Sequence, residues 1–321
     1  MSESRVSPSE PLGADRPTGR RRSDRVVAAS DSSRQTVEEA STAARSNLPV
    51  VIRGPAGSGR QHIARAIHAW SARAAEPFVA LSVGGILEAA HERELAGTSD
   101  SSEPLLSGSH AGAVERAGGG TLYIAGLRQI SASARSALLG GLRDGSVRRA
   151  DGGSIALEAR VILAIEDAEE PALGDLQHHV VSLSALTERP EDILPLATHF
   201  LAQVAESDGV PAVGFTSDAR RWLLDEPWPG NVRELRERVR SAVRLAGNGA
   251  LSAEALLLAA EGDVVPSFKE AKRAFETRYV EGLLRRCSGN ISRAARLAKK
   301  DRKDFYDVIR RTGVDPGQFR S

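Results

Sequence analysis

The segment GPAGSGRQ at residues 54–61 has the residue types and spacing of a loop that binds phosphate groups. Its pattern nearly matches G-x-x-x-x-G-K-[ST], in which glycines let backbone N–H groups surround phosphate oxygens and a lysine adds charge. The candidate nucleotide-binding positions in this loop are Gly54, Gly57, Ser58, Gly59, Arg60 and Gln61. Arginine replaces the lysine at Arg60, and its planar guanidinium is wider than an ammonium. The loop therefore predicts a phosphate-binding fold with an altered cation.

Metal chemistry has little support in the composition. Cys287 is the only cysteine, which excludes an internal disulfide and a zinc site built from cysteines, and we expect no metal.

Hydrophobic residues make up 41% of the chain, which is ordinary for a globular protein, and no apolar run approaches the roughly 20 residues of a membrane span. The N-terminal sequence lacks an apolar signal core, so we expect a cytoplasmic protein that binds no membrane.

Short apolar runs alternate with helical patterns around the glycine-rich loop, which is typical of helices that cover a parallel sheet. The predicted strands are 49–53, 78–82, 120–124, 159–165 and 180–183. The predicted helices are 35–45, one directly after the loop, 87–95 and 131–143. The strand before the loop and the helix after it position the glycines, and the N-terminus of that helix adds positive potential.

After residue 186 the pattern becomes helical, with prolines and glycines at the helix ends. The predicted helices here are 190–207, 217–224, 232–246 and 253–260. The first residues of the chain are rich in Ser, Pro, Arg and Gly and have no hydrophobic period, which predicts disorder. The chain is thus expected to contain a disordered arm (1–33), an α/β subdomain (34–186), a helical lid (187–262) and a C-terminal helical domain (263–321).

The C-terminal segment carries an excess of positive charge. Residues 267–321 contain 15 Lys and Arg against 7 Asp and Glu, whereas residues 1–266 contain 28 basic and 35 acidic residues. This asymmetry favours a polyanionic partner for the C-terminal end, and a solvated basic helix face is the alternative. The helices predicted in this segment are 267–286, 291–298 and 302–311.

Apolar spacing predicts which side chains hold these three helices together. Tyr279 and Leu283 belong to a run in the first helix that repeats at three and four positions. The small or apolar side chains expected where two helices cross are Ala294, Ala295 and Leu297. The side chains left on the outer side of the third helix are Arg302, Lys303, Tyr306, Asp307 and Arg310.

Five blocks of the sequence resemble the bacterial enhancer-binding proteins that activate sigma-54 RNA polymerase. They are GPAGSGRQHIARAIH (54–68), AGGGTLYIAG (117–126), RPEDILPLATHFL (189–201), WPGNVREL (228–235) and GNISRAARLAKKDRKDFYDVIRRTG (289–313). The first four resemble the AAA+ domain of this family, and the fifth resembles its Fis-type helix-turn-helix. The resemblance implies an α/β AAA+ P-loop sheet with helices on both faces, a helical lid, and ATP as the ligand of the cleft.

The acidic residues that catalyse hydrolysis in this family are replaced. In the family, a strand ends in Asp-Glu, which hold Mg²⁺ and polarise the attacking water, whereas this sequence has Ala125 and Gly126. Neither side chain can bind a cation or accept a proton. Losing both functions should lower the rate by many orders of magnitude, so we expect no ATP hydrolysis.

Other positions of the nucleotide site also differ from the family pattern in ways that weaken nucleotide binding. Glu166 stands where the family has a polar asparagine that senses the γ-phosphate, and a carboxylate there would repel phosphate. Leu173 and His179 stand where the family has its arginine fingers. Arg233 does match the sensor arginine of the lid, with a structural surface arginine as the alternative. With Arg60 in the loop, these changes argue against tight binding of ATP.

The loop that contacts sigma-54 in this family carries the motif GAFTGA. The matching stretch, residues 101–106, reads SSEPLL and lacks the phenylalanine and the glycines. We therefore expect no contact with sigma-54, while contact with RNA polymerase through another surface stays open.

The resemblance assigns DNA binding to the last two helices. The candidate DNA-binding residues are Ser292, Arg293, Arg296, Arg302, Lys303, Tyr306 and Arg310. Residues early in the last helix would reach base edges in the major groove, and the others would meet phosphates. Family modules of this kind dimerise through their long first helix, so we expect a homodimer or higher oligomer on palindromic double-stranded DNA. Asp304 and Asp307 depart from the family's usual Thr and Arg, which leaves the target sequence open.

These features together predict a sequence-specific DNA-binding transcription regulator whose AAA+ domain does not hydrolyse ATP. The first alternative is an ATP-driven activator of sigma-54 polymerase. The second alternative is a non-catalytic protein that organises DNA.

Overall fold

A computed structural model of the chain describes residues 26–98, 110–149, 151–166, 173, 176–246, 249–259 and 268–319. The chain divides into two compact units, Met1–Ala185 and Leu186–Ser321. None of the helices within these described ranges is long and apolar enough to cross a membrane.

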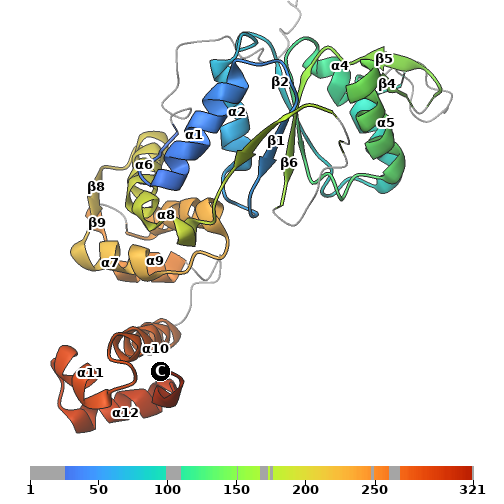
Figure 1. Cartoon of the computed structure of the whole chain (residues 1–321). Coiled ribbons are helices and arrows are strands. Elements are labelled where there is room, and N and C mark those ends of the chain that lie inside the picture. The colour runs from blue at the N-terminus through green and yellow to red at the C-terminus, as the bar shows by residue number, and fades with distance from the viewer. Residues whose placement is uncertain are drawn as a thin grey trace, which may run out of the picture. The chain divides into compact units, whose positions relative to one another are not determined.

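The first unit is built on a five-stranded sheet in the order β2-β3-β6-β1-β7, with every neighbouring pair parallel (Figure 1). The strands are β1 (Val50–Arg53), β2 (Phe78–Ser82), β3 (Thr121–Ala125), β6 (Arg160–Ile165) and β7 (His179–Ser182). All residues of β6 are buried, as expected for a strand covered on both faces. The five predicted strands are all present, with small shifts at their ends.

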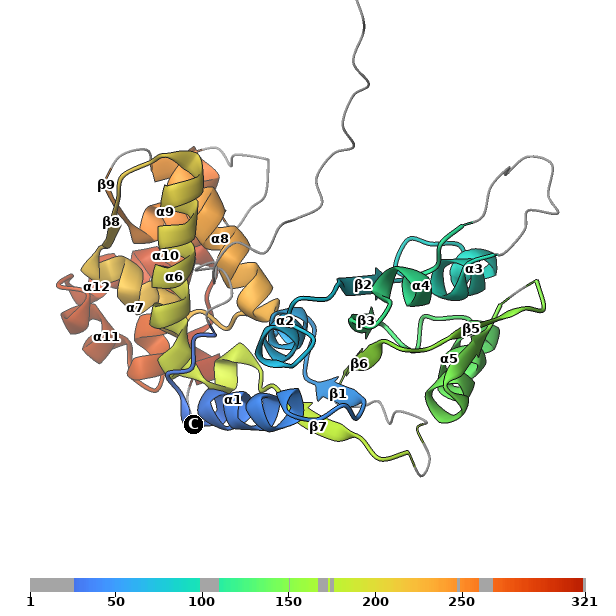
Figure 2. The same ribbon diagram turned by 90° about the horizontal axis from the view of Figure 1, so that it is seen from above.

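Helices cover both faces of this sheet, as Figures 1 and 2 show. On one face, α1 (Asp31–Ala44) and α2 (Arg60–Trp70) pack against a cluster that includes Val50 and Ile52. On the other face, α3 (His91–Ala96), α4 (Ala113–Ala117) and α5 (Ala132–Asp144) pack around Val51 and Leu163. The predicted α/β class with a parallel sheet and helices on both faces is therefore confirmed.

Helix α1 begins earlier than the composition predicted. Ser30 is its N-cap, and the Ser30 side-chain oxygen accepts a hydrogen bond of 3.1 Å from the backbone N–H of Ser33. Ser30 is buried, and Thr36 on the next turn donates to the carbonyl oxygen of Ser182 at 2.6 Å. Residues 31–33 therefore belong to a helix and not to an arm, which corrects the expected boundary, because a capping serine outweighs the polar composition.

Three short strand pairs or bridges were not predicted. An antiparallel hairpin joins β4 (Ser146–Arg148) to β5 (Ser154–Ala156), directly after α5. In the second unit, β8 (Ala212–Phe215) pairs in parallel with β9 (Gly249–Leu251). An isolated bridge joins Thr98 to His110, and the stretch 101–106 considered for sigma-54 contact lies outside the described residues.

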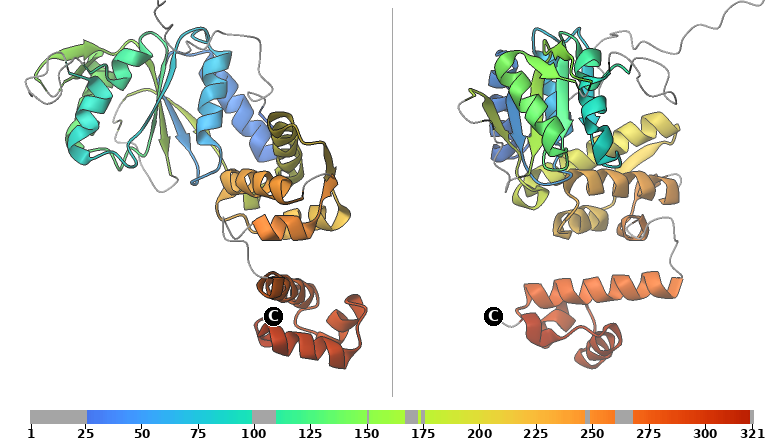
Figure 3. Two further views of the ribbon diagram at one scale, coloured as in Figure 1. Left: turned by 180° about the vertical axis from the view of Figure 1, so that it is seen from behind. Right: turned by 90° about the vertical axis from the view of Figure 1, so that its right-hand side faces the viewer.

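The second unit contains seven helices among its described residues, in addition to short 3-10 turns (Figure 3). Four of them match the predicted lid helices, namely α6 (Ile193–Asp208), α7 (Ser217–Asp225), α8 (Asn231–Ala246) and α9 (Ala253–Leu258). The other three are α10 (Phe268–Arg286), α11 (Ile291–Leu297) and α12 (Arg302–Thr312).

The last three helices share one small core. Its buried members are Val280, Leu284, Cys287, Ala294, Ala295, Phe305 and Ile309. Asn290 caps α11 and Asp301 caps α12, each by accepting a backbone N–H. Two core predictions were wrong, because Tyr279 is 45% exposed and Leu297 is 55% exposed. The buried face of α10 runs through Val280 and Leu284, one position away from the predicted stripe.

Candidate nucleotide cleft and nucleic-acid interface

The glycine-rich loop connects β1 to α2 at the carboxyl edge of the sheet. Gly54 has φ +153°, and a Cβ at this position would lie 2.7 Å from the carbonyl oxygen of Leu183, so only glycine fits. Gly57 and Gly59 also have positive φ, at +75° and +109°. Ser58 is buried within the loop, whereas Gln61 is exposed on the first turn of α2. The structure thus places the six predicted loop residues together.

Arg60 points back onto the loop that contains it. Its Nη1 atom donates to the carbonyl oxygen of Gly54 at 2.9 Å and to the carbonyl oxygen of Ile165 at 2.6 Å. These carbonyls lie at the carboxyl ends of β1 and β6, which pair in parallel through Arg53 and Ile165. The guanidinium is therefore hydrogen-bonded to protein backbone at the place where a lysine would be free to meet phosphate.

The end of β3 has a backbone suited to glycine. Gly126 has φ +73°, and its carbonyl oxygen accepts from the N–H of Gln129 at 2.8 Å. A Cβ at this position would lie 3.1 Å from the side-chain oxygen of Gln129. Ala125 packs against the core cluster that contains Tyr123 and Val181. An acidic side chain is thus absent from both positions, and the local geometry at Gly126 disfavours one.

Glu166, Leu173 and His179, the remaining positions predicted for the nucleotide site in the first unit, offer no guanidinium. Glu166 follows β6 and is exposed. Leu173 is 2% exposed and belongs to the sheet core, and His179 is the first residue of β7. Across the described ranges, no group of three or more His, Cys, Asp or Glu side chains is close enough to hold a metal ion.

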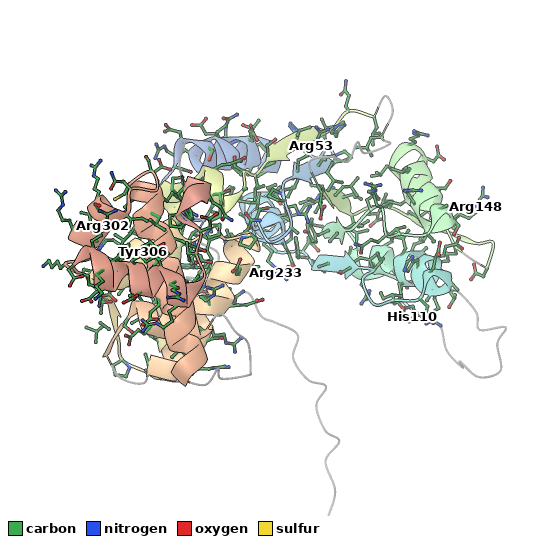
Figure 4. The ribbon with its side chains drawn as sticks, turned by 90° about the horizontal axis from the view of Figure 1, so that it is seen from below. Arg53, His110, Arg148, Arg233, Arg302 and Tyr306 are labelled. Carbon is green, nitrogen blue, oxygen red and sulfur yellow. The ribbon has the colours of Figure 1, made fainter. Side chains whose placement is uncertain are left out.

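In the lid, a strained turn precedes the helix that carries Arg233. Trp228 and Asn231 both have positive φ, at +46° and +55°, and Trp228 is 1% exposed. The indole N–H of Trp228 donates to the carbonyl oxygen of Leu223 at 2.9 Å. Asn231 accepts from the backbone N–H of Leu186 at 2.8 Å through its side-chain oxygen. Arg233 follows on the first turn of α8 and is exposed (Figure 4).

Glu234 and Arg238 hold this turn against the aromatic side chains. One oxygen of Glu234 accepts from the N–H of Gly230 at 2.8 Å, and the other accepts from Arg238 at 2.6 Å. The Arg238 guanidinium lies 5.4 Å from the ring centroids of both Trp222 and Trp228. Cation–π contacts of this kind strengthen when the cation is buried, as Arg238 is. These contacts fix the start of α8, on which Arg233 stands.

One buried histidine supports the sheet from the side of α2. His68 and Thr121 form a hydrogen bond of 2.9 Å between Nδ1 and Oγ1. Burial lowers the pKa of His68 below its ordinary value of 6.5, and the nearby charge of Arg65 lowers it further. The backbone of Glu76 acts in the opposite direction by hydrogen bonding. His68 is therefore a neutral structural group that joins α2 to β3.

The outer face of α12 is strongly polar. Arg302, Lys303, Tyr306 and Arg310 are all exposed, whereas Phe305 and Ile309 face the core (Figure 4 labels Arg302 and Tyr306). On α11, Arg293 and Arg296 are exposed and Ser292 is half-buried. The structure thus places the seven predicted DNA-contacting residues on the surface of two neighbouring helices.

A bidentate ion pair, missed by the sequence analysis, holds α12 against α10. Arg311 donates from Nε and Nη2 to the two carboxylate oxygens of Glu276, at 3.1 and 2.8 Å. Planar fork-to-carboxylate pairs of this type fix orientation as well as adding energy. No spacing rule could have found it, because the two residues are 35 positions apart on different helices.

The chain matches two family models, a Sigma-54 interaction domain over residues 26–177 and an AAA+ ATPase lid domain over residues 187–267. It is 33% identical over 316 residues to transcriptional regulatory protein GlrR of Escherichia coli K12, covering 94% of this chain and 71% of the relative. The chain belongs to the family of sigma-54-dependent transcriptional regulators. This finding confirms the resemblance to the sigma-54 activator family that the first four sequence blocks indicated.

Other members of the sigma-54 regulator family agree with this assignment. The nitrogen assimilation regulatory protein NtrX of Azorhizobium caulinodans is 30% identical over 296 residues, covering 84% of this chain and 64% of the relative. The solved structure of NtrX from Brucella abortus in complex with ADP has a TM-score of 0.67 at 28% identity, covering 91% of this chain and 70% of that one. The complex of the same protein with ATP has a TM-score of 0.66 at 29% identity, covering 90% and 70%. Both matched family models end before α11 and α12, so the predicted DNA-binding residues lie outside the matched ranges.

Proposed function

We propose that this member of the sigma-54 regulator family is a DNA-binding transcription regulator whose AAA+ domain does not hydrolyse ATP. The observation that carries the proposal is the inward direction of Arg60. The Arg60 guanidinium donates to the carbonyl oxygens of Gly54 and Ile165, and these two hydrogen bonds direct it away from the position where a bound phosphate would need a cation.

The absence of acidic groups at the end of β3 supports the same conclusion. Phosphoryl transfer to water relies on a metal that neutralises developing charge and on a group that orients the nucleophile. Ala125 and Gly126 can supply neither. If nucleotide does bind the loop through backbone N–H groups, Gly57, Ser58 and Gly59 are the residues that would hold it, and no metal is expected with it.

DNA binding is assigned to α11 and α12. Among their exposed cations are Arg293, Arg296, Arg302, Lys303 and Arg310. A helix with a basic outer face and a buried inner face is the arrangement by which helix-turn-helix domains enter the major groove. A two-fold dimer would place two such helices on a palindromic site, with Ser292 and Tyr306 as further phosphate contacts.

A steady-state phosphate-release assay with the full chain and promoter DNA tests the catalytic part. The proposed function predicts no turnover above background. An ATP-driven activator of sigma-54 polymerase is the second candidate, which the match to the Sigma-54 interaction domain favours. Turnover that Arg60→Ala abolishes would establish this second candidate and refute the proposal.

The DNA-binding part is tested separately by retardation of DNA fragments at several salt concentrations. Arg302→Ala should weaken binding to the specific site, and Arg293→Ala should weaken all binding and reduce the salt dependence by about one phosphate contact. Gln318→Ala, on the exposed C-terminal 3-10 turn, is the matched control.

Genome-wide occupancy distinguishes a regulator, which gives few palindromic peaks, from a DNA-organising protein, which gives broad coverage.

A further inference from the structure

Asp307 lies in the middle of the exposed face of α12. Phe305 is 1% exposed and Ile309 is 4% exposed, so these two side chains define the inner face of the helix. Successive side chains are about 100° apart around a helix. The direction opposite to the middle of this inner face therefore falls at Asp307, with Lys303 about 40° to one side of it and Arg311 about 40° to the other. These are the side chains that project furthest from the core.

On the side of Asp307 that carries Arg311, two charged residues make contacts of their own. Arg311 is turned toward α10, where it pairs with Glu276. Asp304 lies on that same flank, and its backbone N–H donates to the capping oxygen of Asp301 at 2.8 Å. Within the described ranges, no ion pair or hydrogen bond engages the Asp307 carboxylate. It is thus exposed and available at the outermost line of the helix.

A helix that enters the major groove presents its outermost line to base edges and its flanks to phosphates. A carboxylate at that line is repelled by the acceptors guanine O6 and N7 and thymine O4. Adenine offers an amino group, but its N7 acceptor lies beside it. Cytosine offers its N4 amino group as a donor, and carboxylates are known to accept from it.

We propose that Asp307 selects cytosine in each half-site by accepting a hydrogen bond from its N4 amino group. This inference rests on the proposed DNA-binding function and adds a base-specific acceptor to it. Lys303 lies one turn before Asp307, about 6 Å along the helix, and its ammonium can donate to guanine O6 or N7. Base pairs are about 3.4 Å apart, so the half-site should contain a guanine and a cytosine read within two base pairs of each other.

Selection of bound sequences from random DNA duplexes tests this assignment with the full chain. The wild-type protein should favour cytosine over each other base by about tenfold at one position of each half-site. Asp307→Asn should shift that position to adenine, because an asparagine amide pairs with adenine N6 and N7. Asp307→Ala should remove the preference at that position and raise affinity for all sequences, since one negative charge is lost near phosphates.

Asp304→Asn is the matched control, because it removes the same charge from the flank of the same helix. It should raise overall affinity while leaving the selected sequence unchanged. An Asp307→Asn motif identical to the wild-type motif would overturn the inference while leaving the DNA-binding function intact. Loss of the cytosine preference in the Asp304→Asn variant as well would also overturn the inference. A wild-type chain that enriches no sequence and retards no DNA would overturn both.

Discussion

The Nη1 atom of Arg60 lies 2.6 Å from the carbonyl oxygen of Ile165, which joins the first residue of α2 to the last residue of β6. A charged donor makes a stronger hydrogen bond to a carbonyl than a neutral one does. In this chain the Arg60 guanidinium therefore stabilises the carboxyl ends of β1 and β6. This role requires no phosphate.

Replacing Arg60 should destabilise the first unit. Arg60→Ala removes two hydrogen bonds from a charged, half-buried donor, and the free energy of unfolding should fall by about 1.5–3 kcal/mol. Urea unfolding, monitored by hydrogen–deuterium exchange in peptides from the first unit, measures this change. Gln61→Ala, at the exposed neighbouring position, should have little effect. Equal effects of the two substitutions would contradict a structural role for Arg60.

Substitution at Gly126 should show that an acidic residue cannot simply be restored. Gly126→Ala places a side chain at φ +73° and 3.1 Å from Gln129, so it should cost more than the roughly 1 kcal/mol of the backbone conformation alone. Gly145→Ala is the matched control, because Gly145 has the same φ of +73° and nothing lies within 4 Å of its Cβ position. Identical unfolding free energies for the two variants would mean that the Gln129 side chain moves away from the added methyl group with no loss of stability.

The Glu276–Arg311 pair should show measurable coupling. A double-mutant cycle with Glu276→Gln and Arg311→Gln should give a coupling free energy of about 0.5–1.5 kcal/mol, at the upper end for exposed pairs because the contact is bidentate. The coupling should weaken as salt is raised. Pairing Glu281→Gln with Arg311→Gln provides the comparison, since no ion pair between those two residues is present in the described ranges. A coupling no larger than in that comparison would contradict the prediction.

The pH dependence of stability should carry a contribution from His68. Its pKa is lowered by burial, so the unfolded chain binds a proton near its ordinary pKa of 6.5 while the folded chain stays neutral. The contribution of His68 to the free energy of unfolding should therefore be fully present above about pH 7.5 and should be lost as pH falls through 6.5 toward the folded pKa.

Urea unfolding of the first unit between about pH 5.5 and 8 measures this slope. His68→Gln keeps a polar group beside Thr121 and should flatten the slope. His178→Gln, at a histidine bonded only to the local backbone oxygen of Leu176 in the described part, should leave the slope as in the wild type. A His68→Gln variant that retains the full slope would assign the pH dependence to other groups.

The strands and long helices could be predicted because their patterns are local. The strand Phe78–Ser82 is a short apolar run, and α12 starts after a capping Asp301 and ends at Gly313 with φ +78°. By contrast, β8 pairs with β9 through a strand whose Val213 is 75% exposed, so no alternation marks it. The start of α1 depends on a single buried serine, Ser30, within a polar stretch.

The candidate site was predictable in its residues but not in its contacts. Glycines at positions 54, 57 and 59 identify the loop from spacing alone. The direction of Arg60 depends on the carbonyl of Ile165, which is 105 residues away, and no periodicity reports on that distance. Leu297 was assigned to the core from its type, yet the crossing of α11 and α12 uses Ala294 and Ala295, whose small side chains let the helices approach.

The order of strands in the sheet has a consequence during synthesis of the chain. β1 lies between β6 and β7, so Val50 pairs with Ile162 on one side and His179 on the other. Both partners leave the ribosome long after β1, and the apolar residues of β1 must stay unpaired until then. Contacts between distant segments form slowly, and exposed strands invite aggregation while they wait. Helices α1 and α2, which flank β1 in sequence and pack on Val50 and Ile52, are the elements available to shield it in the nascent chain.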